Sequence, residues 1–155
     1  MTRTTVAKTF AIAIATTLAV SVATTARAGD QECSDATVKG TFAYTSTGFI
    51  TSPPDLAGPF ASVGTQTFDG NGGTTAAAWV SQNGTILPVT ITGTYTVDPD
   101  CTGTFTVEIA PVGITAHVFF AIDENGAEFR ALQTDPGIVV TGIARRQFPA
   151  SDRRH

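Results

Sequence analysis

The sequence predicts an all-β protein in which eight antiparallel strands form a meander that closes into a small barrel. Few windows have a helical period, whereas Thr, Val, Phe, Ile and Gly are frequent and apolar residues alternate with polar ones. Tight-turn sequences also recur at short intervals. A two-sheet β-sandwich is the alternative architecture, but a closed barrel is favoured because it leaves no strand edge unpaired.

Eight segments have the composition of strands. They are residues 38–50, 59–68, 74–82, 86–97, 102–109, 114–123, 127–134 and 138–146. The turn sequences between them, such as Asn83-Gly84 and Asp135-Pro136-Gly137, combine residues that tolerate positive φ with proline, whose φ is fixed. Connections this short force consecutive strands to pair antiparallel.

The segments alternate with a period of two. In 86–97, every second residue from Leu87 to Val97 is apolar, glycine or tyrosine, and threonine fills the opposite face from Thr90 to Thr96. Such alternation is typical of a sheet with one buried and one solvated face. It argues against a membrane-spanning barrel, whose outward face would be apolar.

Residues 1–28 have the features of a cleavable signal peptide. Arg3 and Lys8 precede an uncharged stretch at 9–26, and Ala26-Arg27-Ala28 matches the pattern before a cleavage site. A retained transmembrane anchor is the alternative, but five threonines dilute the apolar stretch. We expect export by the general secretory route, so that the protein is periplasmic or secreted. A single β-barrel domain over 29–148 and a flexible tail over 149–155 would follow the leader.

The charge of the expected mature chain argues against two classes of partner. The full sequence has 9 basic and 13 acidic residues and a net charge of −4. Three of the basic residues and none of the acidic ones lie within 1–28, so six basic and 13 acidic residues remain, with a net charge of −7. Nucleic acids and anionic membranes bind basic surfaces. We therefore expect no nucleic-acid partner and no membrane insertion after cleavage.

The two cysteines, Cys33 and Cys101, both lie in the expected mature chain. An isolated pair in an oxidising compartment most simply forms a disulfide. The alternative is a free nucleophilic thiol with His117 as its base, which export would tend to oxidise.

Four parts of the chain carry a family resemblance: ECSDATVKGTF at 32–42, GPFASVG with FDGNG at 58–64 and 68–72, GTYTV with PDCTG at 93–97 and 99–103, and QTDPGIVVTG at 133–142. They resemble a family of small secreted bacterial proteins with no established function. The resemblance implies an eight-stranded barrel like those of the calycins and allene oxide cyclase. It implies no activity.

Several side chains are candidates for a ligand site in the barrel interior. Five aromatic residues could line an apolar cavity or simply form the core: Phe42, Tyr44, Trp79, Tyr95 and Phe105. Glu128 and Arg130 share one face of 127–134, as either a surface ion pair or the polar anchor of a pocket.

Neither catalytic residues, nor a metal site, nor a cofactor is predicted. His117 is expected on the outer face beside Thr115, and a general-base role would require an orienting carboxylate. No G-x-S-x-G, P-loop or zinc-ligand spacing occurs. Residues 69–73 resemble the start of a calcium loop, but Val80 stands where the bidentate glutamate is required, so a tight turn is favoured.

Two functional hypotheses follow. The first is a non-enzymatic protein that binds a small apolar ligand or contacts a partner through its surface. The second is a cyclase-like or isomerase-like enzyme acting on a lipophilic substrate. The enzyme would need a carboxylate such as Glu108 or Glu128 facing the interior with a raised pKa. A structural component of the envelope is a further alternative.

Overall fold

The computed structural model describes residues 32–148. The expected signal peptide and C-terminal tail lie outside the described residues. None of the helices in the described part of the chain has the length and apolar character needed to cross a membrane.

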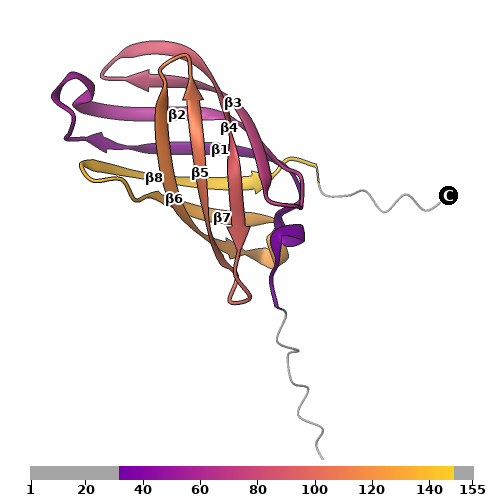
Figure 1. The fold of residues 1–155 in the computed structure, drawn as a ribbon. Helices are drawn as coiled ribbons and strands as arrows, with labels where there is room; N and C mark the ends of the chain where they lie inside the picture. The colour runs from indigo at the N-terminus through magenta and orange to yellow at the C-terminus, as the bar shows by residue number, and fades with distance from the viewer. Residues whose placement is uncertain (1–31, 149–155) are drawn as a thin grey trace, which may run out of the picture. The chain divides into compact units, whose positions relative to one another are not determined.

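Eight antiparallel strands form a meander that closes into a barrel (Figure 1). The strands are β1 (Gly40–Ile50), β2 (Gly58–Phe68), β3 (Gly73–Gln82), β4 (Thr85–Val97), β5 (Thr102–Ala110), β6 (Ile114–Asp123), β7 (Glu128–Gln133) and β8 (Ile138–Arg146). Three short 3-10 helices accompany them: η1 (Asp35–Val38), η2 (Pro54–Leu56) and η3 (Glu124–Gly126). β8 pairs with β1 from Arg146 opposite Phe42 to Ile138 opposite Ile50. The predicted barrel is confirmed, and the sandwich alternative is wrong.

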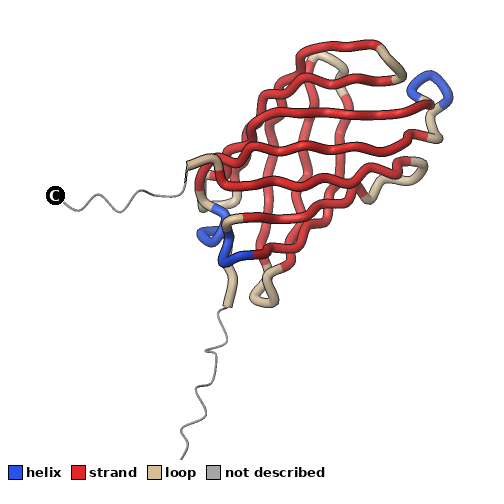
Figure 2. The backbone as a smooth tube through the Cα atoms, turned by 180° about the vertical axis from the view of Figure 1, so that it is seen from behind, coloured by secondary structure: helices blue, strands red, loops and turns tan. Residues whose placement is uncertain are grey.

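The predicted alternation sets which residues face inward. In β4, Leu87, Val89 and Tyr95 are less exposed than the threonines between them. The same period continues around the barrel, so that threonine forms much of the outer face. The connections 69–72, 98–101 and 124–127 lie at one end, called here the closed end, and 51–57, 83–84, 111–113 and 134–137 lie at the other, the open end (Figure 2).

Aromatic rings fill the interior near the closed end. The aromatic cluster consists of Phe42, Phe68, Tyr95, Phe105, Phe120 and Phe129. Phe68 is at its centre, with ring centroids 4.9 Å from Tyr95 and 5.7 Å from Phe42 in edge-to-face geometry. Gly103 makes room for a ring, because a Cβ there would lie 2.6 Å from Cζ of Phe120.

Helix η1 covers the closed end. Val38, expected in the first strand, is instead the last residue of η1 and is fully buried against the aromatic cluster. Oδ1 of Asp35 accepts a 2.7 Å hydrogen bond from the Val97 amide, which attaches η1 to β4. The Tyr95 hydroxyl donates to the Asp35 carbonyl at 3.0 Å and accepts from the Gly70 amide at 2.9 Å. These contacts favour the 3-10 helix at Asp35–Val38 over a continuation of β1 through Val38.

Arg146 holds the same end together from β8. Its guanidinium donates to the carbonyl oxygens of Lys39, Thr37 (3.1 Å) and Gly126 (2.9 Å). The guanidinium carbon lies 4.7 Å from the centroid of the Phe42 ring, within the range of a cation–π contact. Burial lowers the pKa of Arg146, but an arginine in this setting stays charged.

The predicted disulfide between Cys33 and Cys101 is confirmed. Cys101 lies in the turn between β4 and β5, and the Cys33 amide donates to the Pro99 carbonyl in the same turn at 3.2 Å. The bond therefore attaches the segment before η1 to the closed end of the barrel. The described chain also enters and leaves the barrel at this end (Figure 1).

Replacing both cysteines in the variant C33A/C101A should lower the free energy of unfolding by about 4 kcal/mol, because the disulfide closes a loop with a sequence separation of 68. Urea unfolding of the oxidised protein and the variant measures the difference. Wild-type protein reduced with dithiothreitol is the control and should resemble the variant. Alkylation of Cys101 in unreduced protein would contradict the assignment.

Tyr95→Phe should lower the free energy of unfolding by about 1–3 kcal/mol, since it leaves the Gly70 amide and the Asp35 carbonyl without their partner. Urea unfolding at neutral pH measures this change. An unchanged unfolding midpoint would show that the hydroxyl does not hold η1 in place.

Candidate functional site

The open end of the barrel contains a cavity of about 680 Å³. Its mouth is formed by the open-end connections, with Pro53, Asp55, Asn83, Val112 and Pro136 among the residues that line it. The cavity falls within the size range of pockets that hold one small molecule. It reaches down to Phe105 and Phe129, which belong to the aromatic cluster and form its floor.

The walls of the cavity are mostly apolar. Inward residues of β4, β5, β6 and β8 form them: Leu87, Val89, Ile91, Val107, Ile109, Ile114, Val118, Ile138 and Val140. Space remains between these side chains because other inward positions are small, namely Ala76, Ala116, Ala131 and Gly142. A difference in side-chain volume along the barrel axis therefore separates the filled closed end from the hollow open end.

A line of uncharged polar side chains runs down the inner face of β1 and β2. This polar strip consists of Tyr44, Ser46, Ser62 and Gln66. The hydroxyls of Ser46 and Ser62 lie 2.8 Å apart across the two strands. Burial raises the pKa of Tyr44, and a hydrogen bond with Ser62 opposes that rise only in part, so the phenol is neutral at physiological pH.

Gln66 is the deepest member of the polar strip. It is only 6% exposed, and it lies two residues before Phe68, the centre of the aromatic cluster. Its Nε2 donates to Oγ1 of Thr74 at 3.1 Å, and Thr74 in turn donates to the Thr67 carbonyl at 3.0 Å. The Thr74 contact orients the amide of Gln66 at the edge of the floor.

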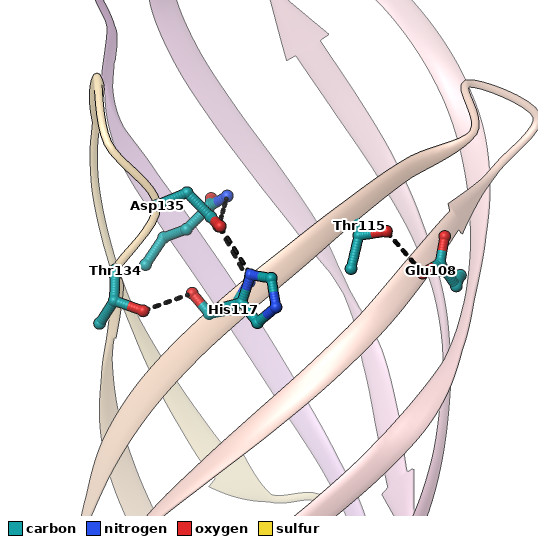
Figure 3. Close-up of polar contacts among 6 residues, drawn as sticks. Glu108, Thr115, His117, Thr134 and Asp135 are labelled. Carbon is teal, nitrogen blue, oxygen red and sulfur yellow. Dashed lines mark hydrogen bonds and ion pairs between the residues drawn. The ribbon is translucent and has the colours of Figure 1, made fainter.

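A second polar group holds the connection between β7 and β8 at the mouth. Nδ1 of His117 lies 2.7 Å from Oδ1 of Asp135, and the His117 amide donates to Oδ2 at 2.9 Å (Figure 3). Gln133 also donates to Oδ2, at 2.9 Å. Burial raises the pKa of Asp135, but the hydrogen bonds from His117 and Gln133 lower it more, so the net pKa is below its ordinary value.

His117 lies on the outer face, as the alternation predicts. Its side chain is 55% exposed, and it does not line the cavity. Asp135 supplies the orienting carboxylate that a general base would need (Figure 3), but only Asp135, at the mouth, lines the cavity. Glu108 accepts a 2.6 Å hydrogen bond from Thr115 on the outer face, and its side chain is likewise exposed. The hydrogen bonds of His117 therefore hold the connection between β7 and β8 in place at the mouth.

Two of the predicted interior residues line the cavity, and the others do not. Tyr44 and Phe105 are in its lining. Phe42 and Tyr95 are buried inside the aromatic cluster below the floor. Trp79, predicted as a possible lining residue, is 58% exposed on the outside, because the inward positions of β3 have even numbers.

Glu128 and Arg130 form the surface ion pair, and the alternative in which they anchor a pocket in the interior is wrong. Phe129, Ala131 and Gln133 of β7 line the cavity instead. Glu128 is buried on the outer face, where Oε2 accepts a 2.5 Å hydrogen bond from Arg145 and Oε1 lies 3.6 Å from Arg130. Burial of the Phe129 ring is favourable, whereas two charges inside the barrel would lose their hydration, and this difference sets the face of β7.

Most of the polar strip and Asp135 were not predicted from the sequence. The sequence feature that indicates the polar strip is a polar residue on an inward face that is otherwise mostly apolar. Gln66 and Ser62 share the face of Phe68, and Ser46 shares the face of Tyr44. Within residues 32–148, no group of three His, Cys, Asp or Glu side chains is arranged to hold a metal ion.

Comparison of the chain with protein-family models, curated proteins and solved structures gives no match. The resemblance to the secreted bacterial family therefore stays a prediction, and the function of the cavity has to be inferred from its own residues.

Asp135→Asn should lower the free energy of unfolding at neutral pH. It should also make that free energy fall less steeply as the pH is lowered. The pKa of Asp135 is lower in the folded chain than in the unfolded chain. Its hydrogen bonds thus add stability above the unfolded value of about 3.9, and this contribution is lost as the pH falls through the lower folded pKa. Urea unfolding at a series of pH values between 7 and 2 measures the effect.

Asp55→Asn is the matched control, since Asp55 is an exposed carboxylate on another mouth connection and forms no hydrogen bond or ion pair within the described chain. It should leave the profile nearly unchanged. Equal acid profiles for wild type and Asp135→Asn would contradict the role of Asp135.

Proposed function

We propose that the protein is a non-enzymatic binding protein that holds one small, largely apolar ligand in the barrel. The observation that carries the proposal is the cavity of about 680 Å³, which is open at one end and lined mainly by aliphatic and aromatic side chains. A barrel interior of this kind typically holds side chains or one small ligand, and here the side chains fill only the closed end.

The apolar walls supply the driving force for binding. Burial of about 300 Å² of the ligand's apolar accessible surface contributes about 7 kcal/mol of favourable free energy to binding. Part of this free energy offsets the loss of translational and rotational freedom, so dissociation constants higher than about 10 μM are expected. The floor and walls belong to paired strands, so the cavity requires little ordering when a ligand binds.

The cyclase-like alternative has less support from the side chains. Glu108 and Glu128, the carboxylates it would use, both lie on the outer face. The carboxylates in the cavity lining are Asp55 and Asp135 at the mouth, and the pKa of Asp135 is lowered, not raised. An interior general acid of the expected kind is therefore lacking among the described residues.

We place this activity in an oxidising compartment, the periplasm or the extracellular space. The Cys33–Cys101 disulfide supports this location, because structural disulfides persist outside the reducing cytosol.

Ala76→Trp should weaken binding of the neutral fluorescent probe N-phenyl-1-naphthylamine by about tenfold or more, since the indole would occupy part of the cavity. Ala77→Trp is the matched control: Ala77 is the next residue of β3 and is exposed on the outer face, so its affinity should stay near that of wild type. Fluorescence titration of the oxidised proteins gives the dissociation constants, and thermal unfolding checks that the variants fold.

Ala76→Phe is a milder substitution for use if Ala76→Trp unfolds the protein. Absence of probe binding to wild type, or equal binding by the Ala76 and Ala77 variants, would overturn the proposed function.

A further inference from the structure

The cavity has a distribution of polar groups that restricts its ligand. None of the described residues that line it is lysine, arginine or histidine. Its carboxylates, Asp55 and Asp135, are confined to connections at the mouth. The polar groups in the depth of the cavity are the uncharged hydroxyls and amide of the polar strip.

Strand pairing stacks the polar strip from floor to mouth. Phe42 pairs with Gln66, Tyr44 with Gly64, and Ser46 with Ser62. By register, Gln66 is therefore the deepest position, Tyr44 is next and the two serines lie closer to the mouth. The Tyr44 hydroxyl forms a hydrogen bond with Ser62. Gly64, the residue opposite Tyr44, allows β3 to approach closely, because a Cβ there would lie 2.6 Å from the Cβ of Ala78.

Gln66 retains hydrogen-bonding capacity toward the cavity. One N–H group of its amide is used by Thr74. Its carbonyl oxygen has no hydrogen-bond donor among the described residues. Every fully buried side-chain N or O atom in the described chain has a hydrogen-bond partner. Because the Gln66 carbonyl oxygen has none, it is not fully buried and keeps some accessible surface. A polar atom of a ligand on the floor could thus complete the amide's hydrogen bonds.

We infer that the ligand is an uncharged lipophile with a hydroxyl or carbonyl oxygen, bound with that oxygen in the polar strip, at Gln66 or at Tyr44, and with its hydrocarbon part against the walls of β4 to β6. The inference deepens the proposed function and rests on it. A ligand hydroxyl donates to the Gln66 carbonyl oxygen, and a ligand carbonyl accepts from the free N–H of Gln66 or from the Tyr44 hydroxyl.

Charged lipophiles fit the cavity less well. A carboxylate placed at the floor would lose its hydration without meeting a cation, and at the mouth it would face Asp55 and Asp135. An ammonium group would be attracted to the mouth but would meet no carboxylate in the depth. Both ions would therefore keep their charged group in water and leave the Gln66 carbonyl oxygen unpaired.

The test is displacement of N-phenyl-1-naphthylamine from oxidised wild-type protein at pH 7.5 by three ten-carbon probes. Decan-1-ol should displace the naphthylamine with a dissociation constant about tenfold lower than those of decanoate and decylammonium, or lower still. Decanoate and decylammonium are used below their critical micelle concentrations and decan-1-ol below its solubility limit, so that no micelles or droplets take up the fluorophore.

Gln66→Leu separates recognition of the oxygen from simple partition into an apolar space. It should weaken decan-1-ol binding by about fivefold or more relative to naphthylamine binding, because the leucine keeps the volume and removes the amide. Gln147→Leu is the matched control, since Gln147 is exposed after β8 at the closed end and does not line the cavity; it should leave decan-1-ol binding near that of wild type. Tyr44→Phe is a second, independent variant and should also weaken decan-1-ol binding selectively.

The outcomes distinguish this inference from the proposed function. Decanoate or decylammonium binding as tightly as decan-1-ol would overturn the inference while the naphthylamine still reports a binding cavity. Unchanged decan-1-ol affinity in both Gln66→Leu and Tyr44→Phe would overturn it as well. Failure of wild type to bind the naphthylamine would overturn the proposed function itself and the inference with it.

Discussion

Pairing of β8 with β1 closes the eight-stranded sheet into a barrel and so encloses an interior. Closure satisfies the backbone groups that two free edges would expose, and it divides every strand into an inside and an outside face. The inside of eight strands is narrow enough for side chains to fill. Whether a cavity remains is then decided by the volumes of the inward residues alone, and here those volumes are large at one end and small at the other.

The closed end is stabilised by charges and rings acting together. Arg146 satisfies three backbone carbonyls and stacks on Phe42, while Asp35 and Tyr95 attach η1 to the barrel. These groups enclose the aromatic cluster, which forms the floor of the cavity on its other side. The cavity proposed to bind a ligand thus rests on a packed aromatic cluster, and the less regular connections lie at the mouth.

The strand pattern and turn sequences predicted the barrel because period-two alternation and short turns are local properties. Apart from Val38 and Lys39, the predicted strand limits differ from the observed ones by one residue at most. The face of β7 was harder to predict because Phe129 and Leu132 lie on opposite faces of one strand. The cavity could not be predicted, since it depends on how side chains from distant strands, such as Ala76 and Ala131, meet across the interior.

Both ends of the described chain lie at the closed end, and the mouth lies at the opposite end. Glu32 and Phe148 are therefore separated from the mouth by the length of the barrel. A label, a fused domain or a solid support joined through either end would leave ligand access unobstructed. The same arrangement would allow the barrel to be held by its ends while the proposed ligand enters and leaves through the mouth.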